Sequence, residues 1–143
     1  MNAFPPFYEL VPHTGAMVLL DAMTHWAVGE ATCELRIREH APFVQEGRVE
    51  SCVTVEYMAQ AVAASLGYEA LMGGAGVRVG MIIACKRFTA HASHLCVGDQ
   101  VTVQVKRTRG NDSLSHFACE LRRDGELFAD AVLTLYHAER PPD

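Results

Sequence analysis

One carboxylate lies in the longest apolar segment of the chain. Glu56 belongs to the run CVTVEYMAQAVAASLGYEALM, and Gln60 follows it by four residues, which is about one turn of a helix. A carboxylate positioned in this way can donate or accept a proton at a reacting carbon. The alternative is a buried carboxylate that is satisfied by backbone groups or by Gln60, because an unpaired charge in an apolar helix is costly. Both interpretations are open at this point.

Histidine supplies the other groups that titrate near neutral pH. His13 follows Pro12 in a proline-rich arm, so it could reach the start of the helix or a neighbouring subunit, or it could be purely structural. His40 precedes Ala41-Pro42-Phe43 and is a second candidate for a proton-transfer group. The remaining histidines suit surface or strand-packing positions and are not expected to bind metal: His25, His91, His94, His116 and His137.

The five cysteines offer less chemistry. No two of them form a Cys-x-x-Cys pair, so we expect reduced, buried thiols. Cys52 directly precedes the helix, where a thiol could act as a nucleophile. No base partner for it can be identified in the sequence, and packing is therefore the better interpretation.

Composition and pattern predict one α+β domain over residues 1–143. Half of the residues are apolar, which suits a single core. Ser51 is expected to cap a helix over residues 52–72 that is buried nearly all round and ends at the glycines 73, 74 and 76. An irregular arm through His13 and a loop or turn over residues 40–51 precede it. Antiparallel strands that wrap the helix are expected over residues 17–28, 31–39, 77–90, 100–109, 114–123 and 127–136, with Asp124-Gly125 as a strong hairpin signal.

Charge and hydropathy exclude several partners. The formal net charge is -5 at pH 7 with neutral histidines, and the basic residues are spread along the chain, so nucleic acid is not expected to bind. No apolar stretch without charges reaches the roughly 18 to 20 residues that cross a bilayer. The N-terminal residues do not follow the pattern of a secretory signal peptide. We expect a cytoplasmic protein.

Three segments together resemble a known family. They are Leu10-Val11-Pro12-His13 with Met17-Val18-Leu19-Leu20-Asp21, the helix motif Val55-Glu56-Tyr57-Met58-Ala59-Gln60-Ala61, and Phe88 through Gly98-Asp99-Gln100-Val101. In this order they resemble the 3-hydroxyacyl-carrier-protein dehydratases. The resemblance implies a hotdog fold, a homodimer or an assembly of dimers, acyl-thioester substrates carried on acyl carrier protein or coenzyme A, and no cofactor.

One departure from the family concerns its catalytic histidine. The family carries this residue in a loop ahead of the helix, whereas the corresponding loop here, residues 45–51, reads QEGRVES, is several residues shorter and contains no histidine. A divergent branch from aryl-polyene pigment clusters shares the shortened loop and the Glu-Tyr-Met-Ala-Gln helix, and the chain resembles that branch most. The departure raises the alternative that the chain is a non-catalytic, acyl-binding partner of a second, active hotdog subunit.

Dehydration of a 3-hydroxyacyl thioester defines the roles that these residues would fill. It needs a base for the C2 proton, an acid for the departing hydroxyl, and donors to the thioester oxygen. We expect Glu56 as the acid or base and His13 as its partner. Gln60 and the first-turn backbone N–H groups of Cys52, Val53 and Thr54 are expected to bind substrate. Arg48 is either a contact for the phosphate of the pantetheine arm or a solvated charge. A hotdog thioesterase, in which the helix carboxylate activates water or attacks the thioester, is the alternative enzyme.

Overall fold

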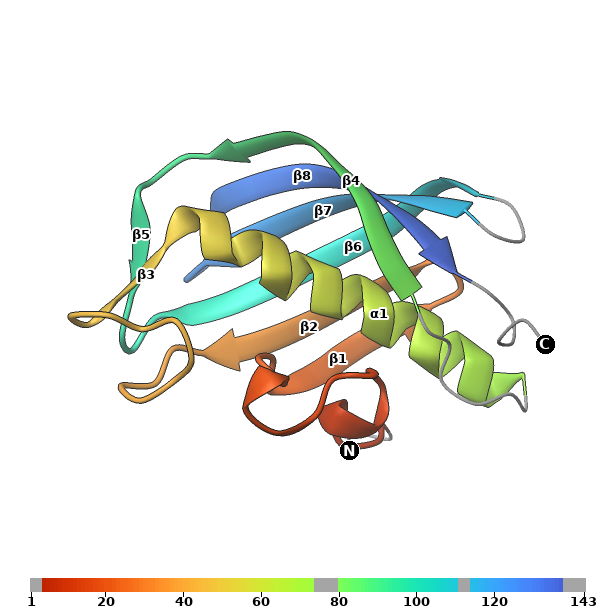
Figure 1. The fold of residues 1–143 in the computed structure, drawn as a ribbon, viewed down its shortest axis with the longest axis horizontal. Helices are drawn as coiled ribbons and strands as arrows, with labels where there is room; N and C mark the ends of the chain where they lie inside the picture. Colours follow the sequence, from red (N-terminus) through yellow and green to blue (C-terminus); the bar gives the residue numbers. More distant parts are fainter. Residues whose placement is uncertain (1–3, 74–79, 111–113, 138–143) are drawn as a thin grey trace.

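The computed structural model describes residues 4–73, 80–110 and 114–137. Its main element is a six-stranded antiparallel sheet in the order β1-β2-β6-β7-β8-β4 (Figure 1). The strands of this sheet are β1 (Ala22–Ala27), β2 (Glu30–Arg36), β6 (Gln100–Gly110), β7 (Leu114–Arg123), β8 (Glu126–His137) and β4 (Gly80–Ala90). A smaller sheet pairs β3 (Arg48–Glu50) with β5 (His94–Cys96). These two strands were not predicted, because three residues are too few to show a period.

The large sheet forms where apolar and polar side chains alternate. In β2 the side chains of Ala31, Cys33 and Leu35 are buried in the core, and the residues between them are only partly buried. The predicted hairpin between β7 and β8 turns at Asp124 and Gly125, which have φ of 49° and 89°. Positive φ at both positions is what an Asp-Gly turn between twisted strands requires.

The helix α1 (Thr54–Met72) lies along the inside of the curved sheet (Figure 1). A single 3₁₀ turn, η3 (Ser51–Val53), precedes it, so the prediction that Ser51 caps the helix is wrong. Ser51 already belongs to a helical turn, and its carbonyl oxygen accepts a hydrogen bond from the Thr54 hydroxyl (2.6 Å). The helix ends before Gly73, as predicted; the glycines at 74 and 76 and the strand residues 77–79 lie outside the described residues.

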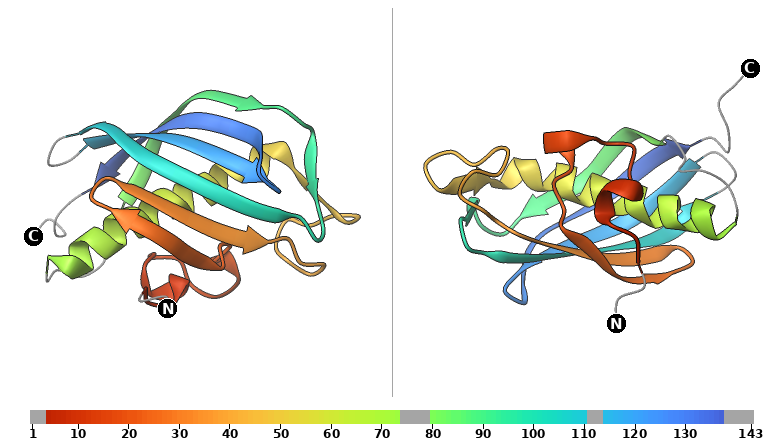
Figure 2. Two further views of the ribbon diagram at one scale, coloured as in Figure 1. Left: turned by 180° about the vertical axis from the view of Figure 1, so that it is seen from behind. Right: turned by 90° about the horizontal axis from the view of Figure 1, so that it is seen from below.

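The N-terminal arm crosses the helix, as Figure 2 shows in its right-hand view. It contains two short 3₁₀ turns, η1 (Phe7–Glu9) and η2 (Gly15–Met17). The amide of Gln60, which is fully buried, holds the arm at two points. Its nitrogen donates to the carbonyl of Met17 (2.6 Å), and its oxygen accepts from the backbone N–H of Leu19 (2.9 Å).

A second attachment of the arm depends on a glycine. Gly67 faces the backbone of Leu10, and a Cβ at position 67 would overlap the Leu10 carbonyl oxygen. The absence of a side chain therefore lets the arm and the helix touch through their backbones. Because these attachments keep residues 10–19 on the helix, the first strand begins at Ala22 and not at residue 17 as predicted.

The architecture is the predicted α+β arrangement, in which an antiparallel sheet wraps a long central helix. One cluster of buried apolar side chains joins the arm, the helix and the sheet. No helix in the described part of the chain is long and apolar enough to span a membrane.

Candidate active site

The structure brings together the two residues predicted to share proton chemistry. Glu56 lies in the first turn of α1, and His13 lies in the arm that crosses the helix. The His13 Nε2 and Glu56 Oε1 atoms are 3.5 Å apart. Their side chains are 25% and 39% exposed, so the pair is partly shielded from water but accessible from one side. A pair with this geometry can hold one proton between its two members.

The other ring nitrogen of His13 is buried. Its Nδ1 atom has no hydrogen-bond partner within the described ranges of the chain. Buried polar atoms in proteins usually have a partner, so an unpaired ring nitrogen beside a carboxylate is unusual. If the Nε2–H is directed at Glu56, Nδ1 is left as an acceptor with a free lone pair. Because this nitrogen is enclosed by protein, contact with substrate falls to the Nε2 side of the ring and to Glu56.

The arm fixes where His13 lies. Leu10 is held against Gly67 on one side of it, and Met17 is held by Gln60 on the other. The histidine thus sits in a short span of chain that is attached to the helix at both ends. Gln60 has both ends of its amide engaged by backbone groups in this attachment, and its predicted contact with substrate stays a prediction.

The amides at the start of the helix are only partly available. The backbone N–H of Thr54 bonds the carbonyl oxygens of Ser51 and Cys52 within the 3₁₀ turn, so a substrate oxygen would have to compete for it. The donor roles of Cys52 and Val53 stay predictions. The expectation of buried thiols is correct for Cys33 and Cys119, and it is wrong for Cys52 and Cys85, which are exposed; Cys96 is partly buried.

Burial decides the chemistry of the thiols. It raises the pKa of Cys33 and of Cys119 to about 12; the charge of Glu34 adds to the first effect, and the neighbouring Cys85 adds to the second. Cys52 and Cys85 are exposed because one lies in the turn before the helix and the other on the edge strand β4.

The other predicted candidates lie away from the Glu56–His13 pair. His40 lines a cavity to which α1 contributes Tyr57. Tyr57 follows Glu56 in sequence but lies on another face of the helix. Arg48 is exposed on β3. His25 and His91 form pairs with Glu30 (3.6 Å) and Asp130 (3.1 Å). Over the residues that the structure describes, no group of three or more His, Cys, Asp or Glu side chains could hold a metal ion.

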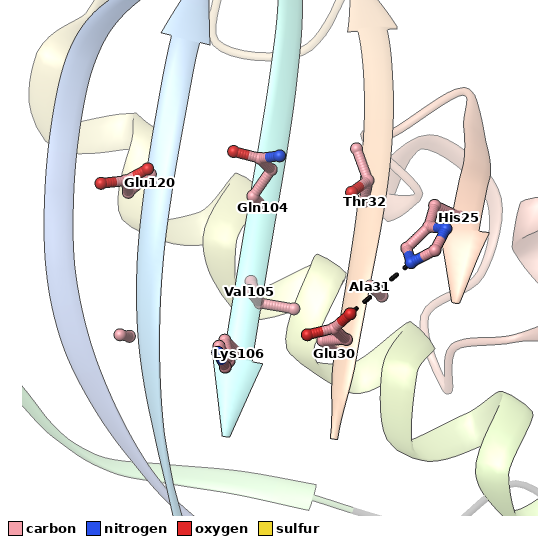
Figure 3. Close-up of a pocket in the computed structure, with 9 residues that line it drawn as sticks. His25, Glu30, Ala31, Thr32, Gln104, Val105, Lys106 and Glu120 are labelled. Carbon is pink, nitrogen blue, oxygen red and sulfur yellow. Dashed lines mark ion pairs between the residues drawn. The ribbon is translucent and has the colours of Figure 1, made fainter. Parts of the chain in front are cut away.

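A separate hollow of about 460 Å³ lies on the sheet (Figure 3). It is lined by His25 and by polar side chains of β2, β6 and β7, such as Glu30, Gln104 and Glu120. These side chains alternate along their strands with residues buried in the core, so the hollow is on the face of the sheet away from the helix. It therefore takes no part in the site around Glu56.

No role was predicted for Tyr57. This side chain is 2% exposed, and burial raises the pKa of its hydroxyl to about 12. A large aromatic residue directly after Glu56 in an alanine-rich segment was a signal in the sequence that Tyr57 faces the core. Its environment could not be inferred without knowing where the arm and the loop after β2 run.

Comparison with known proteins gives one family and several similar folds. The model of the family described as "ApeP-like: ApeP dehydratase" matches residues 5–143. No curated protein matches the chain. The dehydratase heterocomplex ApeI:P from Xenorhabdus doucetiae is 19% identical, with a TM-score of 0.90, and the match covers 98% of this chain and 93% of that one.

Two other solved structures share the fold at lower similarity. The HP0420 homologue from Helicobacter felis has a TM-score of 0.71 at 14% identity, covering 99% of this chain and 96% of that one. A hypothetical thioesterase with coenzyme A from Streptococcus pneumoniae TIGR4 has a TM-score of 0.65 at 8% identity, covering 81% and 86%.

Proposed function

Because the chain belongs to the ApeP-like dehydratase family, we propose that it dehydrates 3-hydroxyacyl thioesters, with Glu56 and His13 as its acid–base pair. The substrate would be carried on acyl carrier protein or coenzyme A, and the product would be the trans-2-enoyl thioester, formed in a fatty-acid or polyene type of biosynthesis. The observation that carries the proposal is the 3.5 Å contact between the two side chains, one from the arm and one from the helix.

The pair can balance the protons of this reaction. The group without the shared proton takes the C2 proton of the substrate, and the group that holds the shared proton gives it to the departing 3-hydroxyl, which leaves as water. The electron pair of the broken C2–H bond forms the C2–C3 double bond. After one turnover the pair again holds a single proton, so no other reactant is needed. Backbone N–H groups at the start of the helix would stabilise the negative charge that develops on the thioester oxygen.

We further propose that the active unit contains a second hotdog subunit. The sheet ends at β4, an edge strand with an exposed Cys85. On the helix, Val55, Ala59 and Ala63 are only partly buried, although they are apolar or small. A neighbouring subunit would cover these surfaces. The similar structure from Xenorhabdus doucetiae is a heterocomplex, which supports pairing with a second subunit of different sequence.

A Glu56→Gln variant tests the catalytic assignment. The purified chain, alone and mixed with any co-purifying hotdog subunit, is assayed for the conjugated enoyl product from 3-hydroxybutyryl thioesters of carrier protein and coenzyme A. We expect Glu56→Gln to lower kcat at least about 100-fold, the usual contribution of general acid–base catalysis. Glu126→Gln, in the exposed hairpin between β7 and β8, is the matched control and should keep full activity. Unchanged turnover in a folded Glu56→Gln protein would contradict the assignment.

The second candidate function is a non-catalytic partner subunit. The observation in its favour is the loop at residues 45–51, which carries no histidine. In that case the isolated chain would have no activity, and Glu56→Gln would not change the turnover of the mixed complex. Release of free thiol from acyl-coenzyme A would instead indicate a thioesterase.

A further inference from the structure

A cavity of about 400 Å³ lies on another side of the helix from the Glu56–His13 pair. Its only helix residue is Tyr57, which is rotated from Glu56 by about 100° around the axis. The walls come from three segments: the end of the arm, the end of β2 and the loop that follows β2. The residues that line it are Val18, Leu19, Asp21, Leu35, Arg36, Arg38, Glu39, His40, Ala41, Pro42 and Tyr57. Its volume is within the range of about 300–1,000 Å³ found for small-molecule sites.

The hydroxyl of Tyr57 is an unused donor in this cavity. The residue is 98% buried, since 2% of its surface is exposed, and its hydroxyl makes no hydrogen bond to any residue in the described part of the chain. The hydroxyl oxygen is not one of the fully buried atoms that lack a partner, so it keeps some contact with solvent, and a molecule in the cavity can reach it. The hydroxyl is protonated at neutral pH, and burial raises its pKa further, to about 12, so it can donate a hydrogen bond to an acceptor oxygen of a molecule in the cavity.

Three of the four charged side chains that line the cavity are already engaged. Asp21 accepts the backbone N–H of Arg36 (2.9 Å) and the guanidinium of Arg38 (2.8 Å). The Arg36 guanidinium donates to the carbonyl of Gly98 (3.2 Å). These contacts fix the rim, and with Glu39 the cavity is lined by two acidic and two basic side chains, so the site does not select for an anion. Apolar side chains such as Leu19 and Leu35 form much of the wall and favour an apolar ligand body.

We propose that this cavity binds a small neutral molecule with an apolar body and one carbonyl oxygen, which accepts a hydrogen bond from Tyr57. The inference rests on the cavity, the unpaired hydroxyl and the neutral rim, and it does not depend on dehydratase activity. Such a carbonyl can belong to a free small molecule or to an acyl group. If the natural ligand is an acyl group, an acyl-coenzyme A thioester displaces a bound probe from the cavity. If it is a free small molecule, the probe stays bound.

Two probes of nearly equal shape test the hydrogen bond. The compound para-fluoroacetophenone carries a carbonyl oxygen, and para-ethylfluorobenzene has nearly the same shape without it. Binding of each is followed by fluorine NMR titration of the full-length protein. We expect the ketone to bind about 2- to 10-fold more tightly, as one net hydrogen bond provides. In Tyr57→Phe the two probes should bind equally, and the melting temperature should not fall, because the lost hydroxyl had no partner.

A blocking variant shows whether the probes occupy this cavity. Ala41 is a partly buried residue of its wall, and Ala41→Phe should abolish binding of both probes while leaving the Glu56–His13 pair intact. Three results would overturn the proposal: neither probe binds the wild type, the preference for the ketone survives in Tyr57→Phe, or Ala41→Phe binds the probes as well as the wild type does.

Discussion

Substituting Gly67 by alanine tests how the arm is held against the helix. In an ordinary helix interior this change stabilises the protein by about 1 kcal/mol, because alanine is the better helix former. Here the new Cβ would overlap the carbonyl oxygen of Leu10, and no side-chain rotation can relieve a clash with backbone. Overpacking costs about 1–3 kcal/mol, and an overlap with backbone belongs near the upper end. We therefore expect a net loss of about 1–2 kcal/mol.

Gly73 provides the matched control for this experiment. It is the C-cap residue directly after α1, where its φ is -85° and a Cβ would be 3.6 Å from the nearest atom, the carbonyl oxygen of Glu69. Gly73→Ala should therefore leave stability unchanged or raise it slightly. By calorimetry Gly67→Ala should lower Tm by about 3–10 °C, at roughly 3–5 °C per kcal/mol for a chain of this size.

Catalysis provides a second readout of the same substitution. Because His13 lies between Leu10 and Met17, displacement of the arm should also lower turnover. A Gly67→Ala protein as stable as Gly73→Ala would refute the reasoning, since the arm could then not be resting on the helix at Leu10.

Three further predictions concern the Gln60 amide and the thiols. Gln60→Leu should lower the free energy of unfolding by about 2–3 kcal/mol, because it leaves two backbone groups of the arm unpaired. Gln104→Leu, at an exposed position of β6, should change the free energy of unfolding little. Chemical denaturation measures both, and equal values would contradict the attachment of the arm by Gln60. The free energy of unfolding should also fall as pH rises above about 9. In the unfolded chain the thiols of Cys33 and Cys119 then lose their protons, whereas in the folded protein they keep them up to about pH 12. Each thiol therefore contributes a loss of about 1.4 kcal/mol per pH unit. At neutral pH iodoacetamide should modify the exposed Cys52 and spare both buried thiols, as mass spectrometry of the native protein would show; a stability that is flat from pH 9 to 11 or rapid labelling of Cys33 would contradict this account.

Much of the fold was predictable because it depends on local pattern. The long helix followed from an apolar segment without proline, and the strands from alternation between turn residues. The hairpin at Asp124-Gly125 followed from the positive φ that these residue types tolerate. The family resemblance then indicated how the sheet and the helix pack.

The errors have a different origin, because they depend on contacts between distant segments. The first strand begins five residues later than predicted because Gln60, 41 residues from Leu19 in sequence, holds the arm on the helix. Ser51 fails as a cap because a 3₁₀ turn begins there. No property of residues 17–21 or of Ser51 alone reveals either effect.

The candidate site was predicted in part. Glu56 and His13 were singled out by residue type and by the resemblance, and the structure places them in contact. The unpaired state of His13 Nδ1 and of the Tyr57 hydroxyl could not be inferred, because it depends on what surrounds each atom in three dimensions.

A double-mutant cycle on the pair tests the central claim most directly. Turnover of a 3-hydroxyacyl thioester is measured for the wild type, Glu56→Gln, His13→Asn and the double variant, each in the assembly that is active with the wild-type chain. If the two residues share one proton, each single variant loses at least about 100-fold in kcat, and the double variant is little worse than either single one. Losses that multiply, or a single variant with wild-type turnover, would contradict the account.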